Sequence, residues 1–321
     1  MIVITGAMGF IGSNLVSRLN KIGQHDLIVV DDFYKWKKDK NLDGKRVHEW
    51  VHRDLFIHYF EKVAPQVDVV FHLGARTDTI SNDKKIFDSL NVNYSKAIWK
   101  ICTENNIPLI YASSAATYGD GNNGFSDDHT IVPSLKPLNE YAISKQLFDE
   151  WVLLQKETPD HWYGLKFFNV YGPNEAHKAR MASVIFHAFN QIRETGNLKL
   201  FKSNHPDFHD GGQLRDFIYV RDVIDMLLDV YEKGPANGIY NVGTGTARTF
   251  EDLGKATFDA LNIPVNIQYV DMPVDLNDKY QNFTEAEMIK WKSAELHLPA
   301  TTLEEGIKDY VQQFLLTGKI A

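Results

Sequence analysis

The sequence predicts an α/β protein built on a doubly wound parallel sheet. Two observations lead to this prediction: a strand–glycine turn–helix pattern at the amino terminus, and regular alternation of strand and helix patterns over the first half of the chain. The apolar run Ile2–Thr5 leads directly into the glycines Gly6, Gly9 and Gly12. Apolar residues at helical spacing follow. This arrangement points the first N–H groups of a helix at a pyrophosphate, so it predicts a dinucleotide site with Phe10 and Ile11 in the turn.

The remaining elements of the first half follow in order. Apolar runs bounded by turn residues predict strands, and 3.6-residue spacing of apolar residues predicts the helices between them. Alternation of this kind implies right-handed crossovers in one parallel sheet. The expected strands are Ile2–Thr5, Leu27–Val30, Val67–His72, Leu109–Ala112 and Tyr163–Phe168, with an edge strand around Val47–Val51, and the expected helices are Phe10–Leu19, Phe56–Val63, Lys84–Asn105 and Tyr141–Lys156.

The second half is less regular. We expect a helix from about Met181 to Arg193, strands at Phe217–Val220 and Ile239–Val242 that return to the sheet, and a helix at Val223–Tyr231 between them. Phe250–Leu261, Val265–Val270 and Leu303–Leu315 would build a smaller α/β unit. The predicted division is a dinucleotide-binding domain of residues 1–168 and about 216–243, and a substrate domain of about 169–215 and 244–321.

Composition favours a cytoplasmic enzyme. The 321 residues are 44% hydrophobic and 24% charged, and the net charge of −8 includes no long basic stripe, which argues against nucleic acid as a partner. Cys102 is the single cysteine, so no internal disulfide forms. No apolar run reaches 18 residues and the amino terminus has no signal pattern, so we expect no membrane association. No metal site is expected.

The end of the second predicted strand bears on the choice of cofactor. Asp31 lies about 20 residues after the glycines, where an acid hydrogen-bonds the adenosine ribose, with Asp32 beside it. A free 2′-hydroxyl suits NAD, whereas the nearby cations Lys38 and Arg53 would suit the 2′-phosphate of NADP. We expect tightly bound NADP, with NAD as the alternative.

Tyr141 and Lys145 form the most informative pair in the chain. They lie four residues apart on a predicted helix, so both side chains project from one face. A tyrosine is a base near neutrality only if its pKa falls from about 10 toward roughly 7, which the positive charge of a neighbouring lysine and of a nicotinamide favours. By itself the spacing also suits an ordinary solvated helix face.

Several ordered motifs resemble the extended short-chain dehydrogenase/reductase superfamily and cover essentially the whole chain. Besides the glycine turn and the Tyr141/Lys145 pair, these are HLGA at 72–75, NVN at 91–93, SSAATYG at 113–119, FNVYGP at 168–173, RDFIYV at 215–220 and YNVGTG at 240–245. The segments KPLNEYAISK, FNVYGPNEAHKARMASV and YQNFTEAE are similar to the ADP-L-glycero-D-manno-heptose 6-epimerase family, whose substrate is a nucleotide-activated heptose of lipopolysaccharide core synthesis. Asp32, Arg76 and the long segment Ser203–Leu214 depart from that family's pattern.

The resemblance implies a fold, a reaction and a homo-oligomer. Such epimerases oxidise a carbinol carbon, here C6 of the heptose, by hydride transfer to bound NADP and return the hydride to the opposite face. Tyr141 would exchange the proton on one face with Lys145 tuning it, Ser114 would hold the reacting oxygen, and Lys178 would be the second base. Lys178 has the alternative of contacting substrate phosphate, and Ser114 that of capping a strand end.

The same resemblance assigns binding residues. Leu73, Gly74, Ala75, Asn91 and Val170 would contact the cofactor, although the Asn91 amide has the alternative of bonding main-chain groups. Arg215 would bind the diphosphate, since a guanidinium does so bidentately. His187 has the alternative of packing in the core or an interface. The further substrate residues by motif position are Ser114, Asn169, Lys178, His187, Phe201, Ser203 and Tyr280.

Three other functions compete with this one. A UDP-galactose-type 4-epimerase shares nearly every motif except the region of Lys178. A 4,6-dehydratase needs an added acid pair after the serine, where this chain has Ala115 and Ala116. A non-catalytic dinucleotide sensor usually loses the tyrosine or the lysine of the pair, and this chain keeps both.

Overall fold

The computed structural model describes residues 1–33, 40–273 and 281–321. Within these ranges the largest element is a seven-stranded sheet in which all neighbours run parallel, in the order β11-β6-β5-β4-β1-β2-β3. The predicted strands are confirmed, including the edge strand. The bounds are β1 Ile2–Thr5, β2 Leu27–Asp31, β3 Glu49–His52, β4 Val69–His72, β5 Leu109–Ser114, β6 Trp162–Phe167 and β11 Gly238–Val242.

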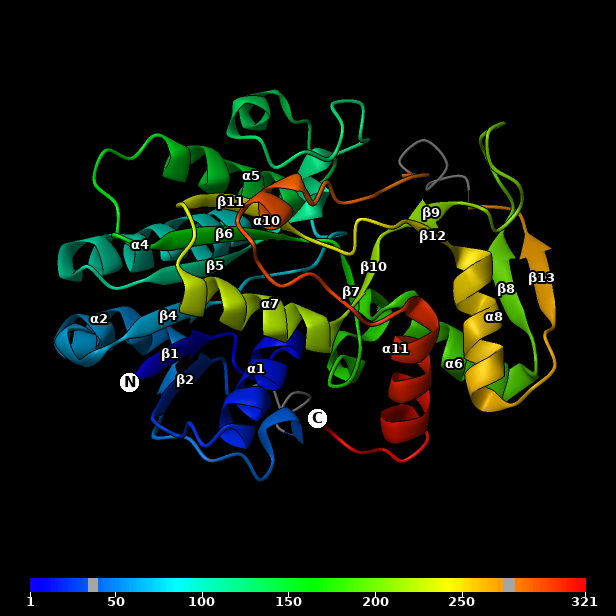
Figure 1. The fold of residues 1–321 in the computed structure, drawn as a ribbon, viewed down its shortest axis with the longest axis horizontal. Helices are drawn as coiled ribbons and strands as arrows, with labels where there is room; N and C mark the ends of the chain where they lie inside the picture. The colour runs from blue at the N-terminus through cyan, green and yellow to red at the C-terminus, as the bar shows by residue number, and fades with distance from the viewer. Residues whose placement is uncertain (34–39, 274–280) are drawn as a thin grey trace.

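Helices cover both faces of this sheet, which confirms the doubly wound prediction (Figure 1). Side chains alternate between faces along each strand, so Ile2 and Ile4 pack into one core and Val3 into the other. On the first face lie α1 (Phe10–Lys21) and α7 (Val220–Lys233). On the second face lie α2 (Arg53–Val63), α4 (Tyr94–Asn105) and α5 (Glu140–Leu153).

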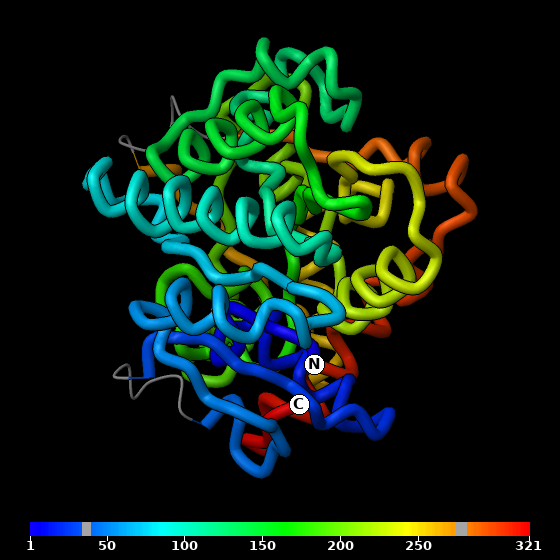
Figure 2. The backbone as a smooth tube through the Cα atoms, turned by 90° about the vertical axis from the view of Figure 1, so that its left-hand side faces the viewer, coloured from blue at the N-terminus to red at the C-terminus, as the bar shows by residue number. Residues whose placement is uncertain are grey.

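The predicted helix over residues 84–105 is a continuous helical segment with a wider turn inside it. It comprises α3 (Lys84–Phe87), a π-helical turn η3 (Asp88–Asn93) and α4. Figure 2 shows this segment in cyan, with α5 in green beside it. A π-helical turn often marks a functional position, and here it contains Asn91.

A smaller group of helices and strands lies to one side of the sheet (Figure 1). Its parallel strands β8 (Leu198–Phe201) and β13 (Ile267–Val270) share a core with α6 (Val184–Thr195) and α8 (Phe250–Leu261). The same core includes α11 (Leu303–Asp309) and the π-helical turn η7 (Tyr310–Leu315) that continues it.

Two short pairs of strands lie between the large sheet and this group. β7 (Asn169–Tyr171) pairs with β10 (Phe217–Tyr219), and β9 (Leu214–Arg215) pairs with β12 (Arg248–Thr249). The expectation that Phe217–Val220 returns to the large sheet is therefore wrong. The helix α7 begins at Val220, directly after β10, and carries the chain back to β11.

Short helices complete the described fold. They are η2 (Ala64–Gln66), η4 (Ala115–Tyr118), η5 (His129–Ser134), η6 (Ala176–Met181) and α10 (Ile289–Ser293). In the described ranges we find no helix that is long and apolar enough to cross a membrane.

Candidate active site

The glycine turn after β1 is packed too tightly for side chains. A Cβ atom at Gly6, whose φ is +67°, would lie 2.6 Å from the Cα of Gly74, and one at Gly12 would lie 2.2 Å from the carbonyl oxygen of Gly6. Gly9 precedes α1, and no side chain caps this helix end. The first N–H groups of α1 therefore face a bare main-chain turn, which fits a dinucleotide pyrophosphate.

The end of β2 holds the residues predicted to select the cofactor. The buried Asp31 carboxylate accepts hydrogen bonds from the main-chain N–H of Met8 at 2.9 Å and of Asp32 at 2.8 Å, so it also fixes the glycine turn. A guanidinium nitrogen of Arg53 lies 3.2 Å from the Asp32 carboxylate. This brings a cation to the predicted ribose position. Lys38 lies outside the described residues.

A cavity of about 320 Å³ opens at the carboxyl ends of the large sheet's strands. It brings together ten predicted site residues from six parts of the chain: Phe10, Ile11, Leu73, Ala75, Ser114, Tyr141, Lys145, Asn169, Val170 and Lys178. The sequence did not indicate the others that line it: Thr77, Thr79, Ala112, Ser113, Phe167, Phe168, Tyr171, Met181, Ala182, Ser183, Val184 and Phe217. Thr77 and Thr79 could have been inferred, since they follow HLGA at a strand's carboxyl end.

Tyr141, Ser114 and Lys145, which the sequence predicts to take part in proton transfer, line one corner of the cavity. Burial raises the pKa of Tyr141 above its ordinary value, and a hydrogen bond with the Ser114 side chain opposes that rise. Lys145 is 5% exposed and donates to the carbonyl of Ala112 at 2.6 Å. Burial lowers the pKa of Lys145 to about 8, against the opposing charge of Asp149. The predicted lowering of the tyrosine pKa is thus not a property of these protein groups alone.

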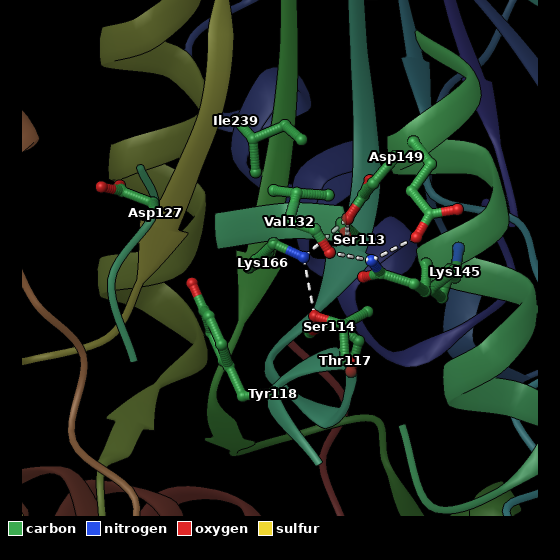
Figure 3. A network of polar contacts seen from close by, with 12 residues as sticks. Ser113, Ser114, Thr117, Tyr118, Asp127, Val132, Lys145, Asp149, Lys166 and Ile239 are labelled. Atoms are coloured by element: carbon green, nitrogen blue, oxygen red, sulfur yellow. Dashed lines mark hydrogen bonds and ion pairs between the residues drawn. The ribbon is translucent and has the colours of Figure 1, made fainter. Parts of the chain in front are cut away.

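A buried ion pair between Lys166 and Asp149 lies next to these residues (Figure 3). The Lys166 ammonium lies 2.7 Å from the Asp149 carboxylate and donates to Thr117 Oγ1 at 2.6 Å, and both charged side chains are fully buried. The carboxylate also accepts from Ser113 Oγ at 2.6 Å and from the Tyr111 hydroxyl at 3.1 Å. Asp149 therefore ties α5, which carries Tyr141 and Lys145, to β5, which carries Ser114.

Asn91 acts as a brace between two walls of the site and does not line the cavity. Its Oδ1 accepts from the main-chain N–H of Arg76 at 2.8 Å, and its Nδ2 donates to the Arg76 carbonyl at 2.9 Å and to Ser144 Oγ at 2.9 Å. It thus joins the loop after β4 to α5. These contacts agree with the alternative that the Asn91 amide bonds main-chain groups, and not with a direct contact to the cofactor.

Lys178 lines the cavity from η6, where its ammonium lies 5.3 Å from the centre of the Phe10 ring. Burial lowers the pKa of Lys178, while the charge of Glu175 raises it. The turn is fixed to the glycine loop through Asn41, which donates to the carbonyls of Met8 at 3.0 Å and Asn174 at 3.1 Å. Lys178 is therefore a half-buried cation beside the predicted cofactor turn.

The other predicted substrate residues that the structure describes do not line this cavity. His187 is exposed on α6, so the alternative of core packing is wrong. Ser203 donates to the His205 carbonyl at 2.8 Å within its own loop, and Phe201 ends β8. Arg215 is buried with its guanidinium carbon 5.5 Å from the centre of the Phe250 ring. Tyr280 lies outside the described residues.

Two loops meet across the mouth of the cavity. Asp78 pairs with Arg76 at 3.0 Å and with Arg180 at 3.4 Å, and Thr79 contacts the sulfur of Met181 at 3.7 Å. These contacts join the loop after β4 to the turn that carries Lys178. Arg76, noted as a departure from the family pattern, belongs to this ion-pair cluster.

The chain is similar to known proteins over nearly its whole length. The model of the NAD dependent epimerase/dehydratase family matches residues 2–243. The chain belongs to this family. Among curated relatives, an ADP-L-glycero-D-manno-heptose-6-epimerase of Nitratidesulfovibrio vulgaris is 46% identical over 317 residues, covering 98% of each chain. One of the same name from Fusobacterium nucleatum is 44% identical over 325 residues, again covering 98% of each.

A solved structure supports the same family membership. The crystal structure of Helicobacter pylori ADP-L-glycero-D-manno-heptose-6-epimerase aligns with a TM-score of 0.79 at 28% identity, covering 97% of this chain and 95% of that one. As a member of the NAD dependent epimerase/dehydratase family, the chain is an NAD(P)-dependent nucleotide-sugar epimerase.

Proposed function

We propose that the protein interconverts ADP-D-glycero-D-manno-heptose and ADP-L-glycero-D-manno-heptose by transient oxidation at C6, with NADP held throughout. One observation carries the proposal: two groups able to exchange protons, Tyr141 on α5 and Lys178 on η6, line the same cavity as the glycine turn. Inversion requires that C6 present each face in turn to one fixed hydride carrier, so its oxygen would lie at two different places in the site. Tyr141 and Lys178 would be the acid/base groups at those two places.

The residues of the glycine turn and of β2 fit the cofactor. Gly6, Gly9 and Gly12 leave room for the pyrophosphate at the amino end of α1, and Asp31 stands at the ribose position. Arg53 beside Asp32 supports NADP over NAD, because a guanidinium suits a 2′-phosphate. The bound nicotinamide would accept the C6 hydride and return it to the other face.

The protein groups would move the protons and hold the oxygen. Tyr141 Oη would take the C6 hydroxyl proton on one face, with Ser114 Oγ donating a hydrogen bond as negative charge develops. Lys178 Nζ would exchange the proton on the other face, and burial already moves its pKa toward the working range. Lys145, held at the Ala112 carbonyl, supplies positive charge near Tyr141.

The identity of the sugar rests on the relatives. Both curated relatives named above carry the heptose epimerase name over nearly the whole chain. The segment 177–183, which brings Lys178 and Met181 to the cavity, is part of the sequence that resembles the heptose epimerase family. A cytoplasmic role in lipopolysaccharide core synthesis follows from that substrate.

Proton NMR of the purified protein with ADP-D-glycero-D-manno-heptose and no added cofactor tests the proposal. Appearance of the L-glycero epimer would establish the substrate, the inversion and a retained cofactor together. No change with this sugar, followed by turnover of UDP-galactose, would leave the redox chemistry and replace the heptose by the 4-epimerase assignment.

A further inference from the structure

Glu175 is a fully buried carboxylate three residues before Lys178, and the mechanism above gives it no role. Its Oε1 accepts from Ser183 Oγ at 2.6 Å and from the main-chain N–H of Gly172 at 3.4 Å. Its Oε2 accepts from the main-chain N–H of Ser183 at 2.5 Å. The Tyr310 hydroxyl also hydrogen-bonds to the carboxylate. Acidic side chains are almost never fully buried unless they are paired. The burial of Glu175 therefore points to a structural or functional role for its carboxylate.

Burial raises the pKa of Glu175, and two kinds of contact oppose that rise: hydrogen bonds from the neutral donors of Ser183 and Tyr310, and the positive charge of Lys178. In turn, the negative charge of Glu175 raises the pKa of Lys178 against the effect of burial. The main chain couples the two as well, because the Lys178 N–H donates to the Glu175 carbonyl at 2.9 Å. The Glu175 carboxylate is fully buried and Lys178 is half-buried, and Coulomb interactions are stronger there than in water.

The elements around the pair add other polar groups. Arg180 and His177 share the turn, but Arg180 pairs with Asp78 and His177 hydrogen-bonds with Asn41. The Phe10 ring of α1 faces the Lys178 ammonium, and Tyr310 reaches Glu175 from η7. Ser183 in turn caps α6 by accepting from the Phe186 N–H at 3.2 Å. One carboxylate therefore links η6, α6 and η7.

We propose that Glu175 is the positioning residue of Lys178: its buried negative charge keeps the lysine able to carry a proton, and its hydrogen bonds fix the turn that aims it. Burial alone would lower the pKa of Lys178 further than burial opposed by a nearby negative charge, and a group that must both take and give a proton needs both states within reach. The inference rests on the proposed role of Lys178 as the second acid/base.

The test measures the charge of Lys178 directly. Lysines of the intact protein are methylated with ¹³C-formaldehyde, the Lys178 signal is identified by its absence in Lys178→Arg, and its titration midpoint is followed by NMR. Glu175→Gln removes the charge with little change in shape, so the midpoint is expected at lower pH. Tyr310→Phe removes a neutral donor to the same carboxylate and is the matched control, with an unchanged midpoint.

An unmoved midpoint in Glu175→Gln would overturn the proposal. If that variant does not fold, Glu175→Asp keeps the charge and shortens the side chain. It is expected to keep the midpoint and to lose at least 10-fold in kcat, because the turn is no longer fixed. A midpoint lowered with the charge retained would also refute the inference. Absence of epimerase activity in the wild-type protein would instead refute the proposed function, since the titration does not depend on turnover.

Discussion

Lys145 donates a 2.6 Å hydrogen bond to the main-chain carbonyl of Ala112, which fixes the lysine of α5 to strand β5 inside the cavity. A buried ammonium with a single main-chain acceptor is poorly solvated, and burial lowers its pKa to about 8. The consequence for stability can be measured.

The pKa of Lys145 in the folded protein lies below its ordinary value of 10.5, so between pH 8 and 10.5 the unfolded chain binds more protons at this position. Stability contributed by Lys145 therefore rises as the pH increases through this range and is lost as the pH falls to 8. Lys145→Met removes this dependence. Urea denaturation of both proteins at several pH values should show the wild type gaining free energy of unfolding relative to the variant toward pH 10.5. The exposed Lys156, changed to Met, is the control and should show no such gain.

Tyr141→Phe should reduce kcat by at least about 10²-fold, because it removes one of the two groups proposed to exchange the C6 hydroxyl proton. The fold should be retained, because the change removes one hydroxyl group, which hydrogen-bonds with the Ser114 side chain. Single-turnover NMR assays with the sugar nucleotide measure the rate. A variant with near-normal turnover would remove Tyr141 from the mechanism.

Arg53→Ala should weaken NADP binding at least 10-fold, or about 1.4 kcal/mol, and change NAD binding much less. The guanidinium lies beside Asp32 at the end of β2, where the ribose 2′-substituent of the proposed cofactor would lie. Fluorescence titration of protein stripped of cofactor compares the two nucleotides. Equal losses for both would count against a 2′-phosphate contact and in favour of NAD.

Lys166→Met should destabilise the protein by about 3–5 kcal/mol, because it leaves the fully buried Asp149 carboxylate without its cation. Adding Asp149→Asn to this variant should recover part of the loss, since the buried carboxylate that had lost the Lys166 ammonium is then removed. Urea denaturation midpoints at pH 7 give the comparison. Equal stability of the single and double variants would show that the charge of Asp149 is stabilised by its hydrogen bonds alone.

Ala179→Gly should raise the free energy of unfolding by about 1 kcal/mol. Ala179 has φ 49° and ψ −122°, a conformation that glycine adopts without the strain of a Cβ atom. Relief of strain is partly offset by the greater freedom of glycine in the unfolded chain. Thermal unfolding measures the change, and a lower melting temperature would contradict it.

Local patterns predicted most of the large sheet. Strands such as Ile2–Thr5 and Leu27–Val30 are short apolar runs, and both of their faces are buried. A continuous apolar run is typical of a central parallel strand, so the local pattern was enough to predict them. Phe217–Tyr219 has the same pattern, yet it pairs with β7. Strand pairing is a tertiary choice, because three apolar residues fit either partner equally well.

The site divides in the same way. The glycine turn, Asp31 and the Tyr141/Lys145 spacing are local in sequence, so the chain by itself determined the dinucleotide fold and one proton-transfer pair. The placement of Lys178 at the same cavity, the bracing role of Asn91 and the Glu175 and Lys166–Asp149 contacts were decided by tertiary structure. The physical reason is that burial and charge pairing depend on which distant segments meet, and no residue's own neighbours in sequence contain that information.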